Sequence, residues 1–171
     1  MTAAPTLTTE RLTLRPHAMA DFRPYAAVMT SERAIYMGGP YTATEAWGWF
    51  ASDVAQWDLL GHGGLAVTET ATGDIVGQVS VIQPPEYPEP ELGWIAFAGH
   101  EGKGYITEAA ARLRDHAWSG IGVGSLVSYI DSRNDRSIAV ARRLGAIEDP
   151  DAARTDYADL VYRHPAPETV Q

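Results

Sequence analysis

The N-terminal half of the chain combines one strand pattern with two helical patterns. Leu12 and Leu14 are separated by polar residues, which is typical of a strand with one buried face. Apolar residues at helical spacing predict a helix over residues 22–29, with Asp21 at its N-cap. A second helical segment is predicted from Thr44 onward. Its expected apolar face consists of Trp47, Phe50, Val54 and Trp57.

The rest of the chain contains short apolar, β-branched runs and two further helical patterns. The runs are separated by Gly- and Pro-rich turns, so we expect strands at each of them. These strands cover residues 64–68, 75–82, 91–97, 126–130 and 159–162. Helices are predicted over residues 106–118 and 134–144, and Gly145 closes the second. Hairpin strands together with a strand–helix–strand crossover predict a mixed sheet covered by helices.

Length and composition fit one ordinary globular domain. The chain has 171 residues, of which 45% are hydrophobic and 20% charged. No apolar run approaches the roughly 20 residues that span a bilayer, and the N-terminus lacks the features of a signal peptide. The chain has no cysteine, which excludes disulfides and a cysteine nucleophile and fits a reducing cytoplasm. We expect one cytoplasmic domain over residues 1–171, with flexible ends at 1–8 and 165–171, and no metal site.

The charge distribution divides the chain into two regions. The net charge of −9 argues against a nucleic-acid binder, which needs a basic face. Residues 100–145 hold seven cations and five anions, whereas the rest holds six cations and seventeen anions. Between Arg33 and Lys103 there is no Lys or Arg at all. One region therefore suits an anionic ligand and the other a cationic one, although two solvated surface patches would give the same pattern.

A glycine-rich turn joins the predicted strand 91–97 to the helix that follows. The first N–H groups of a helix have no acceptor within it, and the helix dipole places partial positive charge there. Gly102 and Gly104 let the backbone approach a bulky anion, so the turn suits a phosphate or pyrophosphate. The alternative is a purely structural turn. A Walker loop is absent, and Thr107 stands where a dinucleotide-binding fingerprint needs its third glycine.

Four motifs occur in a fixed order along nearly the whole chain. They are Thr9-Glu-Arg-Leu-Thr-Leu-Arg15, Glu91-Leu-Gly-Trp94, Gly102-Lys-Gly-Tyr-Ile-Thr-Glu-Ala109 and Asn134-Asp-Arg-Ser-Ile-Ala-Val-Ala-Arg-Arg-Leu-Gly145. Together they resemble the GNAT superfamily of N-acetyltransferases, especially its RimJ/RimL-like branch. The resemblance implies an α+β fold, a mixed, mostly antiparallel sheet of six to seven strands flanked by about four helices in an α/β/α sandwich. It also implies acetyl-CoA as cosubstrate.

The resemblance assigns cofactor-binding roles to two segments of the chain. The strand edge at Ile95, Ala96 and Phe97 would pair with the pantetheine arm of coenzyme A. Asn134 would touch the same arm, and Ser137 would reach the thioester sulfur. The pyrophosphate would be held by the backbone amides of Gly102, Lys103, Gly104, Tyr105, Ile106 and Thr107.

Two residues depart from the family pattern in this loop. Glu101 stands where Gln or Arg is usual, and Ile106 stands where a small residue is usual. Because the phosphate contacts are made mainly by the backbone, we expect weaker cofactor binding rather than its loss. Ala146 also replaces a usual phenylalanine after Gly145, which concerns packing.

Acetyl transfer to an amine needs a base for the surplus proton. We favour Glu91, partly desolvated by Tyr87 and Trp94 so that its pKa rises. Glu86 and Glu89 are rivals, and a solvated carboxylate at a strand end is the alternative. Ser137 would donate a proton to the leaving thiolate or hydrogen-bond the sulfur. It would otherwise be an ordinary residue of a first helical turn capped by Asn134.

The acceptor is expected to be a cationic amine. Aromatic residues lie in the cation-free segment where the family builds its acceptor pocket, although core packing would also explain them. They are Tyr36, Tyr41, Trp47, Trp49 and Trp57. A peptide or protein N-terminus, a polyamine-like molecule and an aminoglycoside-like molecule all fit. No nucleic-acid or membrane partner is expected, and a homodimer is left open.

Two other functions remain open at this point. One is an acyl-CoA-binding sensor or regulatory module without turnover, and the other is an acidic scaffold protein with a vestigial fold. Since the chain has no cysteine, an acetyl-cysteine intermediate is impossible and an enzyme would act by direct transfer.

Overall fold

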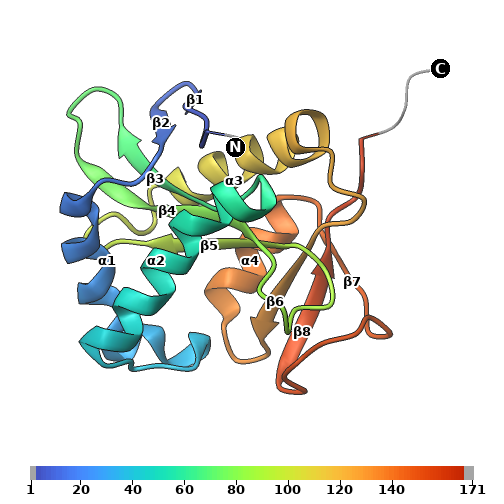
Figure 1. Ribbon diagram of the computed structural model, residues 1–171. Coiled ribbons are helices and arrows are strands. Elements are labelled where there is room, and N and C mark those ends of the chain that lie inside the picture. Colours follow the sequence, from blue (N-terminus) through green and yellow to red (C-terminus); the bar gives the residue numbers. More distant parts are fainter. Residues whose placement is uncertain (1–2, 168–171) are drawn as a thin grey trace.

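A central sheet of eight strands runs through the described part of the chain, residues 3–167 of a computed structural model (Figure 1). The strand order is β1-β2-β3-β4-β5-β6-β8-β7. The strands are β1 (Leu7–Thr8), β2 (Leu12–Arg15), β3 (Gly64–Glu69), β4 (Ile75–Ile82), β5 (Glu91–Ala96), β6 (Val127–Asp131), β7 (Ile147–Glu148) and β8 (Asp159–Arg163). Neighbouring strands are antiparallel except β5 and β6, which are parallel. The predicted mixed, mostly antiparallel sheet is confirmed.

The predicted count of six to seven strands is too low, because the two shortest strands were not predicted. β1 and β7 contain two residues each, too few to show an alternating pattern in the sequence. Leu7 is buried in the main core, and residues 7–8 of the segment predicted as a flexible end at 1–8 pair with β2. Residues 1–2 and 168–171 of the predicted ends lie outside the described residues.

Helices cover both faces of the sheet (Figure 1). They are α1 (Phe22–Met29), α2 (Ala43–Leu60), α3 (Tyr105–His116) and α4 (Asp135–Arg143), with short turns η1 (Met19–Asp21), η2 (Glu32–Met37) and η3 (Ala117–Ile121). α1 and α2 lie on one face, and α3 and α4 lie on the other (Figure 1). The larger core cluster joins α3 to β2–β5, and a second cluster joins α1 and α2 to the end of β5. No helix formed by residues 3–167 is long and apolar enough to cross a membrane.

Two predicted helix starts differ from the structure. Asp21 precedes α1, but its carboxylate accepts from the Ala18 amide at 2.7 Å and pairs with Arg15 instead of capping the helix. α2 begins one residue earlier than predicted. Its cap is Thr42, whose hydroxyl accepts from the Glu45 amide while the Glu45 carboxylate accepts from the Thr42 amide.

The predicted apolar face of α2 is only half correct. Phe50 and Trp57 are buried, whereas Trp47 and Val54 are 44% and 39% exposed. The buried side of α2 includes polar side chains instead, Asp53 and Gln56. Buried polar groups usually have hydrogen-bond partners or belong to a site, so the buried Asp53 is a candidate site residue.

Candidate active site

The parallel ladder between β5 and β6 stops after one residue pair, Glu91 and Val127. The Val127 amide donates to the Pro90 carbonyl at 3.1 Å. The next amide in the ladder, that of Tyr129, donates to Glu91 Oε1 at 3.3 Å. The Leu92 carbonyl accepts from the Ser128 hydroxyl at 2.6 Å instead of from β6 backbone. The break therefore places the Glu91 carboxyl between two strands that separate beyond it.

Strand alternation decides which backbone groups of β5 face this break. The Phe97 amide donates to Val76 on β4 at 2.9 Å, and the Phe97 carbonyl accepts from His100. Because hydrogen-bonding direction alternates along a strand, the N–H and C=O groups of Trp94 and Ala96 point toward β6. Of the predicted edge residues Ile95, Ala96 and Phe97, only Ala96 is on this side. Trp94 is the residue that the sequence reasoning missed, although a period of two would have found it.

The turn between β5 and α3 presents a run of free amides. Within residues 3–167, the backbone N–H groups of residues 102–107 make no hydrogen bond. Gly104 caps α3 in the left-handed conformation, with a φ of 77°. A Cβ added to Gly102, whose φ is 74°, would meet no atom within 4 Å. Free amides, a helix N-terminus and open space together fit a pyrophosphate group.

Burial changes the acidity of Glu91. The carboxyl is half-buried, and this burial raises its pKa to about 8, although the Tyr129 amide favours the ionised form. The ring of Tyr87 meets that of Tyr129 edge-on, with centroids 5.5 Å apart. The predicted neighbour Trp94 lies three residues along the strand, hence on the opposite face. There it packs against the α3 cluster and against a third buried cluster, formed by residues of α4, β6 and β8 and by Ala146. Tyr129 takes the place that was expected for Trp94.

The rival carboxylates differ from Glu91. Glu89 forms a two-pronged ion pair with Arg163 at 2.8 and 2.9 Å, and this pair holds the pKa of Glu89 below its usual range. Glu86 is exposed to solvent. Of these three carboxyls, Glu91 therefore combines a raised pKa with a position at the strand break.

Asn134 and Ser137 lie at the start of α4, which follows β6. Asn134 Oδ1 accepts from the Ser137 amide at 3.2 Å and so caps the helix. The Ser137 hydroxyl is half-buried and makes no hydrogen bond to any described residue. Arg136 in the same turn is close enough to lower the pKa of Glu101 in the glycine-rich turn. The start of α4 therefore contributes positive charge to the glycine-rich turn.

Comparison with known proteins decides the family. The family model described as "Acetyltransferase (GNAT) domain" matches residues 11–147. The chain belongs to the GNAT acetyltransferase family. It is similar to the crystal structure of an acetyltransferase from Agrobacterium tumefaciens str. C58, with 48% identity, 95% of each chain covered and a TM-score of 0.92.

Two further relatives are more distant. The uncharacterized protein YkkB of Bacillus subtilis (strain 168) is 32% identical over 76 residues, and the match spans 43% of this chain and 44% of YkkB. Spermidine N-acetyltransferase from Vibrio cholerae, solved with CoA and spermine, has 16% identity, a TM-score of 0.69, and 91% and 94% of the two chains covered. The last likeness shows the fold alone. GNAT proteins use acetyl-CoA as the acetyl donor.

The unusual glutamate in the GNAT loop is compensated by arginines. Glu101 accepts from the Gly99 amide at 2.9 Å and forms an ion pair with Arg33. Although burial opposes ionisation, its own amide, Arg33, Gly99 and Arg136 hold the pKa of Glu101 below its usual range. Arg33 also donates to the Ala96 carbonyl at 2.9 Å. One arginine thus links η2, the end of β5 and the loop.

The second departure from the GNAT loop is accommodated by a glycine on the neighbouring strand. Ile106 is buried at the start of α3, over β4. A Cβ added to Gly77 on β4 would lie 2.7 Å from the Ile106 Cδ1 atom. Gly77 therefore leaves the space that the larger Ile106 occupies, and the helix start is not displaced from the sheet.

The aromatic residues of the expected acceptor segment have different surroundings. The buried Trp57 donates to the Gly64 carbonyl at 2.9 Å, and the exposed Trp47 packs edge-on against Phe22. Trp49 lies near Tyr41, with ring centroids 6.2 Å apart. Trp49 also lines a surface pocket of about 410 Å³ between the N-terminal half of α2 and residues 84–86.

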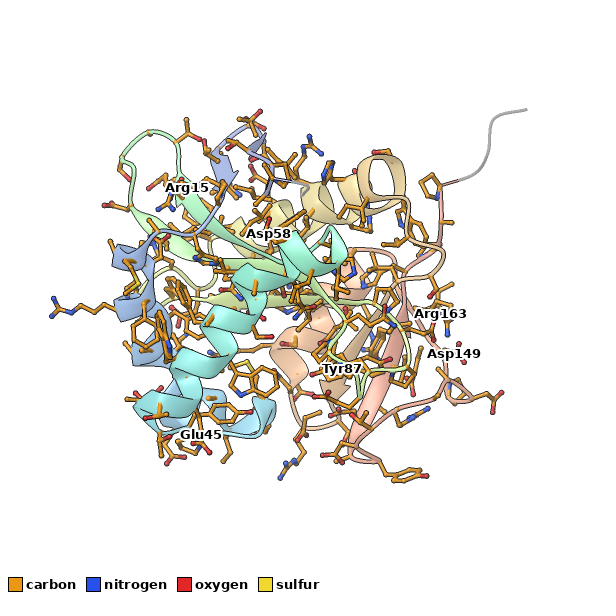
Figure 2. The ribbon with its side chains drawn as sticks, viewed as in Figure 1. Arg15, Glu45, Asp58, Tyr87, Asp149 and Arg163 are labelled. Atoms are coloured by element: carbon orange, nitrogen blue, oxygen red, sulfur yellow. The ribbon has the colours of Figure 1, made fainter. Side chains whose placement is uncertain are left out.

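Tyr87 directly follows the pocket residue Glu86 in the chain. Glu45, which lines the pocket, lies near the start of α2, and Tyr87 lies in the loop beside that helix (Figure 2). The pKa of Tyr87 is raised by burial and then by the charge of Glu91. Tyr87 therefore lies next to both the pocket loop and Glu91. Tyr36 has a separate role, because its ring lies 5.6 Å from the Arg133 guanidinium.

Proposed function

We propose that this GNAT domain transfers the acetyl group of acetyl-CoA directly to a primary amine, and that it is of the RimJ/RimL-like branch. One observation carries the proposal. A run of free amides over residues 102–107 lies at the end of β5, whose other end holds a carboxyl with a pKa raised to about 8. The first feature suits the pyrophosphate of a thioester carrier, and the second suits a base for amine chemistry.

The chain offers groups for each part of coenzyme A, which supplies an activated thioester. The amides of residues 102–107 hold the pyrophosphate, and the edge of β5 at Trp94 and at the Ala96 amide receives the pantetheine arm. Asn134 keeps its Nδ2 group for the same arm, since only its Oδ1 atom caps α4. The Ser137 hydroxyl lies in the same turn with no partner among the described residues, so it is available to the sulfur.

Glu91 acts as the general base. The acceptor's ammonium gives one proton to the Glu91 carboxylate, and the free nitrogen forms a bond to the acetyl carbon. The nitrogen then loses its second proton to solvent as the carbon–sulfur bond breaks. The thiolate is then protonated by solvent or through the Ser137 hydroxyl. A pKa of about 8 suits this role, because a base near the operating pH combines availability with proton affinity.

A cationic acceptor is supported by the charge around the entrance. The pocket between α2 and residues 84–86 is lined by Glu45, Trp49 and Glu86, with no Lys or Arg in its lining. Carboxylates and an aromatic face attract ammonium groups. Peptide N-termini, polyamines and aminoglycosides all carry such groups. Spermidine N-acetyltransferase, which shares the fold, is named for one of them.

A thiol-release screen tests the proposal. The protein is incubated with acetyl-CoA and a panel of peptides, polyamines, aminoglycosides and amino acids, and coenzyme A binding is measured by calorimetry. We expect binding together with amine-dependent thiol release that Glu91→Gln slows at least 100-fold. Binding without release for any amine would instead support an acyl-CoA sensor. Failure to bind would support a scaffold and refute the enzyme.

A further inference from the structure

The α2 face of the sheet has open space beside Glu91. The β4–β5 register places Glu91 opposite Ile82 and Gly93 opposite Ser80. Residues two apart on a strand share a face, so Glu91 and Gly93 both face α2. A Cβ added to Gly93 would lie 3.0 Å from the Ser80 Oγ atom and within 4 Å of no other described atom. Ser80 therefore projects over Gly93, and the space around it is open.

Asp53 of α2 is buried on the same face. It is 6% exposed, and its Oδ2 atom accepts from Gln78 Nε2 at 2.7 Å. Gln78 precedes Ser80 by two residues, so the two side chains share the α2 face of β4. Burial is the main cause of the raised pKa of Glu91, and the charge of Asp53 adds to it. The Gln78 contact and the β4–β5 register therefore place Asp53, Ser80 and Glu91 on the same face of the sheet.

Three side-chain oxygen atoms around this space lack a partner within the protein. Within residues 3–167, neither Asp53 Oδ1 nor Glu91 Oε2 accepts a hydrogen bond. Ser80 is only 5% exposed, and its hydroxyl has no partner in the same range. None of the three oxygens is sealed from solvent, so each is available to a ligand that enters the space. A ligand that brings several N–H donors would satisfy all three groups at once.

An ammonium group is the donor that matches these acceptors. A primary ammonium carries three N–H donors and a positive charge, and no acceptor. Two carboxyl oxygens and a hydroxyl oxygen provide one acceptor for each donor. The chain contains no Lys or Arg between Arg33 and Lys103, which includes every residue of this cluster, so none of its own neighbours in sequence supplies the charge.

We propose that Asp53, Ser80 and Glu91 form the pocket that binds the acceptor's ammonium group, and that this pocket selects primary amines. The inference rests on the proposed function, because it names the substrate class of that site. Glu91 takes the proton, whereas Asp53 and Ser80 hold the nitrogen and Gln78 orients Asp53. A methyl group on the nitrogen would remove one donor and contact Ser80. Secondary amines are therefore poor acceptors.

Kinetics of three variants test the pocket. The probes are n-butylamine and N-methylbutylamine, each with saturating acetyl-CoA. We expect Asp53→Asn to raise KM for n-butylamine at least tenfold while the affinity for coenzyme A stays unchanged. Ser80→Ala should reduce the preference for the primary amine at least threefold. Asp58→Asn is the matched control, because Asp58 is an exposed aspartate on the same helix (Figure 2). It should change neither quantity.

A binding measurement separates this inference from the proposed function. With coenzyme A bound, n-butylammonium chloride is titrated while the side-chain amide signals of Gln78 are followed by NMR. A shift in the wild type that Asp53→Asn and Ser80→Ala each weaken supports the pocket, even if no amine is acetylated. Acetylation with unchanged KM and amine preference in both variants, and no Gln78 shift, overturns the pocket while the proposed function stands.

Discussion

The glycine-rich loop and the ammonium pocket are built in opposite ways. The loop, residues 99–107, offers the backbone amides of one continuous segment, residues 102–107. The pocket offers side chains from three elements, Asp53 on α2, Ser80 on β4 and Glu91 on β5. A backbone site tolerates changes of side chain such as Glu101, whereas a side-chain site fails when one group is replaced. The same enzyme should therefore respond differently to mutation in its two halves.

The largest effect is expected on the pocket side, from Glu91→Gln. We expect kcat to fall about 10²- to 10³-fold with the affinity for coenzyme A unchanged, because general bases contribute on this scale. In the wild type, kcat/KM should rise with pH and level off above about 8, since Glu91 must be ionised to accept a proton. Steady-state rates from pH 6 to 10 measure this. If kcat/KM of the Glu91→Gln variant rises with pH in the same way, Glu91 is not the base.

The loop should respond strongly only to changes that reach its backbone. Gly104→Asp adds a carboxylate beside the bound pyrophosphate at a φ of 77°. We expect the affinity for coenzyme A to drop about 100-fold by calorimetry, since like charges and backbone strain both oppose binding. Gly122→Asp is the control, because Gly122 has a φ of 79° and open space around it. An equal loss of affinity in the control would show that the effect is not local to the loop.

The two carboxyl groups of the pocket should make the free energy of unfolding depend on pH. Burial raises the pKa of Asp53 to about 7 and that of Glu91 to about 8. The folded state therefore keeps protons that the unfolded chain releases above pH 4 to 5, so rising pH up to about 8 favours unfolding. Replacing both by Asn and Gln should flatten this decline by roughly 5 kcal/mol between pH 5.5 and 8.5, about 2 from Asp53 and about 3 from Glu91. Urea unfolding at pH 5.5 and 8.5 compares variant and wild type, and parallel curves would contradict the assignment.

The smallest effect is expected where a side chain supports the loop. Arg33→Ala leaves the charge of Glu101 less compensated beside the pyrophosphate, and exposed ion pairs contribute little. We expect about a threefold loss of affinity for coenzyme A. Glu101→Gln in the same background should restore it, because the repulsion is then gone. A loss that persists in the double variant would mean that Arg33 acts through the Ala96 carbonyl instead.

The same contrast explains what the sequence could predict. Gly102 and Gly104 predict the loop, because the loop is a continuous segment of the chain. The main strands are predicted by the alternation of their apolar and polar residues. The stop in the β5–β6 ladder was not predicted, since it depends on Tyr129 donating to the side chain of Glu91. The alternation along β5 places Trp94 on the face opposite Glu91, so a period of two already argues against Trp94 as a neighbour of Glu91.

Asp53 and Ser80 left a weaker signal that was overlooked. Ser80 interrupts the apolar run of β4, and Asp53 lies between Phe50 and Trp57 on the buried side of α2. A polar residue in such a position is a candidate for a site. That the two meet beside Glu91 depends on the β4–β5 register and on the packing of α2, which no local pattern contains.

Amide chemical shifts during titration with coenzyme A test the central claim most directly. The account predicts that the largest shifts fall on the backbone N–H signals of residues 102–107, with Gly122 unaffected. Saturable binding that leaves those signals in place, or no binding at all, would contradict it.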